Sequence, residues 1–282
     1  MVEHRPFLTF LAHFVLIVGV AVTALPIWIV LVTSTQEASD VLRAPIPMWF
    51  GDQAIENYKA VLGVGITGSS SGPVGPMLLN SLVMALAISI GKIAISLLSA
   101  FAIVYFRFPG RMLAFWTIFV TLMLPVEVRI LPTFEVVAGL HLLNSYAGLT
   151  IPLIASATAT FLFRQFFLTV PDELTEAARV DGAGALKFFK DILLPLSRTN
   201  IAALFVILFI YGWNQYLWPL LVTTDESYYT VVMSIQRMIQ AADAAPEWHH
   251  IAAVAMLALM PPVLVVVLMQ RWFVRGLIET EK

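Results

Sequence analysis

The sequence has 282 residues, of which 60% are hydrophobic and only 12% are charged, and its mean hydropathy is +0.88. A soluble domain carries about 25% charged residues, so a soluble globular enzyme and a disordered chain are both excluded. The net charge of −2 gives no basic excess for nucleic acid, and the absence of cysteine excludes disulfides, thiolate catalysis and Cys-ligated metal sites.

Six stretches of the sequence are apolar enough to cross a membrane, for which a helix needs about 20 residues. We therefore predict an all-α, polytopic membrane protein, with six transmembrane helices in a single domain over 1–282. The predicted spans are 7–33, 77–106, 112–131, 142–163, 199–222 and 251–270. The first span is longer than the apolar part of a signal peptide, which indicates a retained helix.

The distribution of Lys and Arg predicts the orientation, because cytoplasmic loops carry an excess of them. With the N-terminus in the cytoplasm, eleven of the sixteen fall in inside segments, four fall in outside segments and Lys92 lies within a span. Both termini are therefore expected in the cytoplasm. Outside, the Gly- and Ser-rich run 63–75 is expected to be flexible, and a helical stretch is expected over 229–242.

The inside segment 164–198 has the pattern of a folded loop with two short helices. Pro171 and the acidic residues after it favour a helix start, because negative charge is stabilising at the positive end of the helix dipole. Thr169 with Asp172 also fits a capping box. This first helix should run to about Val180.

A turn is expected next at Asp181-Gly182, since this pair is typical of turns. A second amphipathic helix should follow and end at Pro195, with an apolar side made of Phe188, Phe189, Ile192 and Leu193. Small residues at the bend would let the backbone of a partner approach closely. The alternative is a loop that lies on the membrane and binds no partner.

Glu176, Ala177 and Ala178, followed after three residues by Gly182, resemble the EAA loop of permease subunits of ABC importers. In that family the loop forms a helix that docks in a cleft of the cytoplasmic ATPase. The resemblance implies the type I importer permease fold. It also implies an ATPase-coupling role for Glu176, Ala177, Ala178, Asp181, Gly182 and Ala183.

Further segments resemble the carbohydrate-importer branch of these permeases, and the likeness as a whole extends over nearly the entire chain. They are Asn80-Ser81, 100–111, 124–129, 156–167 and 212–220. Within that branch, 124–129 and 156–167 are most similar to permeases for sn-glycerol-3-phosphate. The resemblance therefore implies sn-glycerol-3-phosphate or a glycerophosphodiester as cargo, with a neutral sugar as the alternative.

The chain has no Gly-rich loop followed by Lys and Ser or Thr, because Gly91-Lys92 lacks the upstream glycine and precedes Ile93. We therefore expect no catalysis here, and no cofactor or metal in this chain: ATP and Mg²⁺ belong to a partner. The resemblance implies a homologous second permease, two copies of a cytoplasmic ATPase and an extracytoplasmic substrate-binding protein, all at a bacterial inner membrane. An ion-driven secondary carrier is the less favoured alternative, since paired intramembrane carboxylates and an internal repeat are absent.

Five polar residues are candidates for the substrate path. Lys92 lies near the centre of its span, where an unpartnered charge costs roughly 2.5–3.5 kcal/mol, so it should face protein or water. It could attract an anion or could pair with a carboxylate or carbonyls of a neighbouring helix. Arg129 suits a phosphate but could equally anchor at the interface or pair with a partner.

Asn214, Gln215 and Tyr216 interrupt the fifth span with polar groups that either line a pathway or bond across helices. The neighbouring Trp213 and Trp218 could belong to an interfacial aromatic belt.

Overall fold

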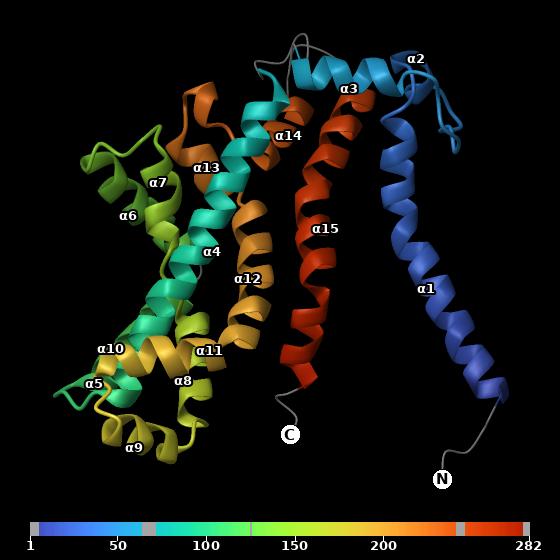
Figure 1. The fold of residues 1–282 in the computed structure, drawn as a ribbon. Coiled ribbons are helices and arrows are strands. Elements are labelled where there is room, and N and C mark those ends of the chain that lie inside the picture. Colours follow the sequence, from blue (N-terminus) through green and yellow to red (C-terminus); the bar gives the residue numbers. More distant parts are fainter. Residues whose placement is uncertain (1–5, 64–71, 125, 241–245, 279–282) are drawn as a thin grey trace. The chain divides into compact units, whose positions relative to one another are not determined.

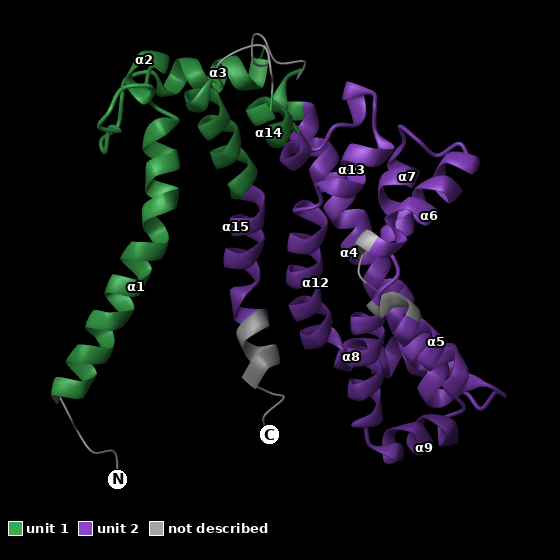
Figure 2. Cartoon of the chain, turned by 180° about the vertical axis from the view of Figure 1, so that it is seen from behind, with its two compact units in different colours: residues 1–75, 234–259 green, residues 76–233, 260–282 purple. Residues whose placement is uncertain are grey.

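The computed structural model describes residues 6–63, 72–124, 126–240 and 246–278, and every regular element among them is a helix (Figure 1). The all-α prediction is therefore confirmed for the described part of the chain. Two compact units are formed (Figure 2): unit 1 comprises residues 1–75 and 234–259, and unit 2 comprises 76–233 and 260–282. A single domain stays a prediction.

Three helices of the described residues are each long and apolar enough to cross a membrane. They are α1 (Pro6–Thr33), α4 (Val74–Tyr105) and α15 (Trp248–Ile278). Their bounds agree closely with the first, second and sixth predicted spans. α15 continues beyond the predicted end at 270, and α4 begins three residues before the predicted start at 77.

The other three predicted spans are each divided in the structure. The span over 112–131 becomes α5 (Arg111–Met123) and α6 (Val126–Gly139). The span over 142–163 becomes α7 (Tyr146–Thr150), a 3-10 turn (Ile151–Leu153) and α8 (Ala157–Leu168), with a bend of 49°. The span over 199–222 becomes α12 (Arg198–Trp213) and α13 (Leu217–Val222). The count of six crossings therefore stays a prediction.

Side chains satisfy backbone groups in two of the divided spans, as irregular backbone at membrane depth requires. The hydroxyl of Ser156 accepts a hydrogen bond from the backbone N–H of Ala159 at the start of α8, at 3.2 Å. Trp218 Nε1 of α13 donates to the carbonyl of Gly148 in α7, at 3.1 Å. These two bonds belong to the divided spans over 142–163 and 199–222.

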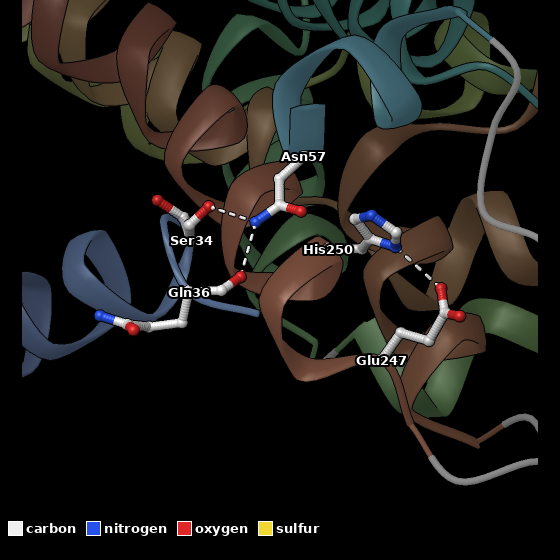
Figure 3. Close-up of polar contacts among 5 residues, drawn as sticks. All are labelled: Ser34, Gln36, Asn57, Glu247 and His250. Carbon is white, nitrogen blue, oxygen red and sulfur yellow. Dashed lines mark hydrogen bonds and ion pairs between the residues drawn. The ribbon is translucent and has the colours of Figure 1, made fainter. Parts of the chain in front are cut away.

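Unit 1 contains α1, the short helix α2 (Ala38–Val41) and α3 (Ala54–Gly63). The Nδ2 of Asn57 donates to the carbonyls of Ser34 and Gln36, at 3.1 and 2.9 Å (Figure 3). The same view shows His250 Nδ1 paired with Glu247 at 2.8 Å. Most of the predicted flexible run, 64–71, lies outside the described residues.

The polar segment after α13 contains a 3-10 turn (Glu226–Tyr228) and α14 (Val231–Gln240). α14 confirms the predicted helical stretch as far as Gln240, and the predicted end at 242 lies outside the described residues.

Unit 2 has two apolar clusters along α4. The first, which we call the α9-side core after α9 (Asp172–Val180), contains Ile93, Leu97, Ala100, Phe101, Ala159, Phe163, Phe167, Ala178, Phe188, Leu193, Leu204 and Leu208. The second, the α13-side core, contains Met84, Ile88, Ile130, Val137, Leu149, Leu153, Trp218 and Val222. Position 92 of α4 lies between the parts of the helix that serve the two cores.

Glycines let helices approach closely beside that position. A Cβ at Gly212 of α12 would lie 2.9 Å from the Cα of Ala85, and one at Gly91 would lie 2.8 Å from a side-chain carbon of Ile154. Small residues at such contacts are typical of helix packing in membranes. The backbones of α4 and α12 therefore meet within two turns of Lys92.

Candidate functional site

The first helix of the predicted coupling loop is α9 (Asp172–Val180), which confirms the predicted end. Pro171 occupies the position before the first turn, and Asp172 and Glu173 lie within that turn. The capping-box prediction is wrong. The Thr169 hydroxyl donates to the carbonyl of Phe166 at 2.7 Å, so it satisfies the end of α8 and not the start of α9.

Gly182 forms the predicted bend through a left-handed backbone, with φ of +70°. The N–H of Ala183 donates to the carbonyl of Ala178 at 2.8 Å, and the N–H of Gly182 donates to that of Arg179 at 3.0 Å. These two bonds are the Schellman motif that closes a helix. No atom lies within 4 Å of a Cβ built at Gly182, so the need for glycine comes from the backbone conformation and not from crowding.

The predicted coupling residues differ in how far they are exposed to solvent. Glu176, Ala177, Asp181 and Gly182 are exposed, and Ala183 is half-buried. Ala178 is 5% exposed and belongs to the α9-side core, so it faces inward instead of toward a partner. Ala178 therefore anchors α9 to the membrane helices, and its exposed neighbours form the outer surface.

A cavity of about 140 Å³ lies beneath α9. Aromatic side chains line it together with Ala178 and Arg179. The rings are Phe101 and Tyr105 of α4, Phe106 just after α4, and Phe188 of the second loop helix. Tyr105 OH donates to the carbonyl of Phe167 at 3.3 Å, which ties α4 to α8 beside the cavity. Free space therefore remains where the loop meets the core.

The second helix of the loop runs from Ala185 to Leu196, through α10 (Ala185–Phe188), a π-helical segment (Phe189–Leu193) and α11 (Leu194–Leu196). Phe188 and Leu193 are buried, as the amphipathic pattern predicts. The helix ends at Leu196, one residue after the predicted end at Pro195. The wider π-helical turn precedes the proline, which has no N–H to donate, and the chain bends by 71° after Leu196.

Lys92 is only 7% exposed, and its Nζ lies 3.7 Å from the centre of the Tyr211 ring of α12. This is a cation–π contact, which is stronger away from water. No carboxylate lies within 4.0 Å of its ammonium in the part of the chain that the structure describes. The carboxylate partner that we considered is therefore not found among these residues.

Tyr211 also connects two of the other predicted residues to Lys92. Arg129 of α6 is half-buried and lies close enough to Lys92 and to Tyr211 to interact with both electrostatically. Gln215 Nε2 donates to the Tyr211 carbonyl at 3.1 Å. Lys92, Arg129 and Gln215 are thus brought together around a residue that sequence reasoning missed.

The remaining path candidates lie in the break between α12 and α13. Asn214 is exposed and Tyr216 is half-buried, and neither has a described contact to Lys92. Trp213 and Trp218 are each 2% exposed, so they do not form a lipid-facing aromatic belt. The only hint of Tyr211 in the sequence is its place one turn before Gln215 in an apolar helix.

At the other end of α4, Asn80 connects three segments. Its Nδ2 donates to the carbonyls of Ser227 and Tyr229, at 2.7 and 3.0 Å, and its Oδ1 accepts from Tyr146 OH at 2.6 Å. The next residue, Ser81, accepts from the N–H of Val231 at 2.9 Å. This polar pair fixes the segment after α13 onto α4 and α7.

Comparison with known proteins gives consistent matches. The family described as "Binding-protein-dependent transport system inner membrane component" matches residues 92–279. The chain is 56% identical to the sn-glycerol-3-phosphate transport system permease protein UgpE of Brucella melitensis, 57% to that of Agrobacterium fabrum and 58% to that of Yersinia pestis. Each match covers all 282 residues of this chain and the whole relative.

Among solved structures, a bacterial ABC transporter involved in the import of the acidic polysaccharide alginate has a similar chain, with a TM-score of 0.80 at 19% identity. That match covers 97% of this chain and 99% of the other, and it confirms the predicted permease fold. With the family match over most of the chain and full-length relatives above half identity, this protein belongs to the binding-protein-dependent transport system inner membrane components and is a permease subunit.

Proposed function

We propose that this permease forms half of the pathway of an ATP-driven importer for sn-glycerol-3-phosphate or a glycerophosphodiester. An anionic cargo is supported chiefly by Lys92, a buried cation near the middle of α4. Its ammonium contacts an aromatic ring and no carboxylate of the described residues. Arg129 adds a second positive charge within electrostatic range. An anion passing between helices here would gain two cationic partners that a neutral sugar would not need.

The relatives named for sn-glycerol-3-phosphate transport support the same cargo, because their likeness extends over the whole chain. Within the described part of the path, no observation favours a neutral sugar over a phosphate ester. The ion-driven carrier is disfavoured, since the family is one of binding-protein-dependent systems.

The loop around α9 is proposed to couple this chain to the ATPase. Its exposed residues Glu176, Ala177 and Asp181 would contact the partner, while buried Ala178 would pass the movement to the α9-side core. We propose that two copies of the ATPase bind ATP and Mg²⁺, and that this chain hydrolyses no ATP and holds no cofactor. A homologous permease would complete the pathway, and an extracytoplasmic binding protein would deliver the cargo.

The test of the cargo is uptake of labelled sn-glycerol-3-phosphate into vesicles that contain the complete complex. Unlabelled glycerophosphodiester should reduce the uptake, and maltose at the same concentration should not. Competition by maltose alone would contradict the proposed cargo and would favour the neutral-sugar alternative.

The orientation is proposed from the Lys and Arg distribution, with both termini in the cytoplasm. Ser70, a natural place for an outside label, lies outside the described residues, so we choose the exposed Glu226 instead. The native chain has no cysteine, so the background is clean. Glu226→Cys should react with an impermeant thiol reagent added outside, and Gly184→Cys should react only after permeabilisation. The reverse pattern would contradict the coupling role of the loop.

A further inference from the structure

A groove of about 410 Å³ lies within unit 2, where the second loop helix bends into α12 and meets the last part of α15. Two basic side chains, Lys190 and Arg198, line it from either side of the bend. The rest of the lining is mainly apolar and includes Ile201, Phe205, Met269 and Trp272. The volume is in the range of small-ligand sites.

The two basic residues have no acidic partner in the described part of the chain. Lys190 and Arg198 are exposed, and neither forms an ion pair with a described carboxylate. Two cations that line one groove without such a partner favour an anionic group. The apolar side chains beside them would stay exposed to water if that anion were a small soluble ion.

The groove lies near the charged ends of two predominantly apolar helices, which is where lipid headgroups are expected. Arg198 is the first residue of α12, and positions 199–213 of that helix carry no charge. In α15, Arg271 is the first charged residue after Glu247, and its neighbour Trp272 is 53% exposed. Basic residues and tryptophan at the ends of spans are typical of the interface between hydrocarbon and water.

We propose that this groove binds an anionic phospholipid, with its phosphate at Lys190 and Arg198 and the start of an acyl chain along Phe205 and Met269. Basic pockets between membrane helices bind such headgroups in other membrane proteins. A lipid in the groove contacts both arms of the 71° bend, so its binding stabilises that bend over other arrangements. The proposal concerns a membrane lipid and does not depend on which cargo the importer carries.

The experiment uses the full chain, purified with its co-purifying subunits, in nanodiscs that contain a diazirine-bearing phosphatidylglycerol. Photolabelling, mapped by mass spectrometry, should fall on peptides that contain residues 201–205 and 269–272. Lys190→Gln with Arg198→Gln should weaken phosphatidylglycerol binding by about thirtyfold, at roughly one kcal/mol for each basic residue, and should leave phosphatidylcholine binding unchanged. Both positions are exposed, so the folding should be unaffected.

Arg271→Gln is the matched control, because Arg271 is an exposed basic residue beside Trp272 that does not line the groove. It should keep wild-type labelling. Equal labelling of the double variant and the wild type would overturn the proposal. So would loss of labelling on addition of soluble sn-glycerol-3-phosphate, which would assign the groove to cargo, or crosslinking of the groove to a co-purifying subunit in place of lipid.

Discussion

The two ends of unit 2 are attached to α4 by different kinds of contact. At the α13 end, Asn80, Ser81 and Asn144 make directed hydrogen bonds to backbone groups of the segment after α13. At the α9 end, the loop packs through Ala178 onto an apolar cluster that contains aromatic rings, beside a cavity of about 140 Å³. Hydrogen bonds demand a defined geometry, whereas apolar contacts are not directional.

This difference indicates which end of unit 2 can move as a body. A segment that shifted at the α13 end would leave buried polar groups unpaired, at a cost of about 1–3 kcal/mol each. A shift of α9 over the rings would exchange one apolar contact for another. The α9 end is therefore suited to follow a partner, and the α13 end to keep its shape.

The largest effect is expected from Gly182→Val, which acts at the α9 end. A left-handed backbone costs an L-residue roughly 1–2 kcal/mol, and a β-branched residue more, so the Schellman turn should be lost. Transport and cargo-stimulated ATP hydrolysis should fall by at least about tenfold in reconstituted complexes. Glu176→Gln should do less harm, because it removes a charge and leaves the turn intact.

Gly184→Val is the control for this change. Gly184 has an ordinary φ of −71°, and no atom lies within 4 Å of a Cβ built there, so this variant should transport normally. Cargo capture by the binding protein should be unchanged in all three. A Gly182→Val complex that still binds the ATPase and transports at the wild-type rate would remove the coupling role from the loop.

The second prediction concerns Lys92, at the boundary between the two cores. Lys92→Met removes a charge that would bond an anion, so uptake should fall by roughly tenfold, as expected for a hydrogen bond to a charged group. Lys92→Arg should retain more uptake because it keeps the charge. Ser89→Ala is a control one turn away, since among the described residues Ser89 bonds to carbonyls of its own helix only. Normal transport by an assembled Lys92→Met complex would show that the cation does not serve the cargo.

The third prediction concerns the hydrogen bonds at the α13 end. Asn80→Ala removes two donated hydrogen bonds and the acceptor for Tyr146, so the folded protein should lose about 1–3 kcal/mol. Hydrogen exchange should quicken over 225–231, while residues 172–183 at the α9 end should exchange as in the wild type. Faster exchange at both ends would mean that the two are not separate mechanical regions.

The smallest effect is expected at Asp225, on the surface of the α13 end. The backbone N–H of Ser227, followed by its hydroxyl, holds the pKa of Asp225 below its ordinary value of about 3.9. The stability that this interaction gives to the folded state is fully present above the unfolded pKa of Asp225. It is lost as the pH falls through the lower folded pKa. Protection of the Ser227 amide from exchange should therefore drop below about pH 4, and Asp225→Asn should abolish that dependence. An unchanged pH profile in the variant would assign the protection to other groups.

The uninterrupted helices could be predicted from the sequence because hydropathy and length determine them. The breaks could not, since a broken span is as apolar as a continuous one. Pro125, Pro152, Ser156 and the polar run Asn214-Gln215-Tyr216 were the available signals, and each is equally compatible with a kinked helix. The broken spans also make contacts between distant parts of the chain, such as the bond from Trp218 to the Gly148 carbonyl, and these leave no local pattern in the sequence.

The bend at Gly182 was predictable from turn chemistry, and the structure agrees with it. The inward direction of Ala178 was not, because an alanine in an exposed helix carries no sign of the face on which it lies. Tyr211 was missed for a similar reason. It lies 119 residues after Lys92 in the sequence, and a contact between residues so far apart cannot be predicted from a local sequence pattern.

The contact between Lys92 and Tyr211 also has a consequence for biogenesis. α1 is almost entirely exposed and uncharged, so it can enter the bilayer as soon as it leaves the ribosome. α4 is different, since the ring that shields its lysine is synthesised much later, with α12. At about 5–20 residues per second, the delay is on the order of ten seconds. During that interval the Lys92 ammonium of the nascent chain lacks the ring that shields it in the folded protein.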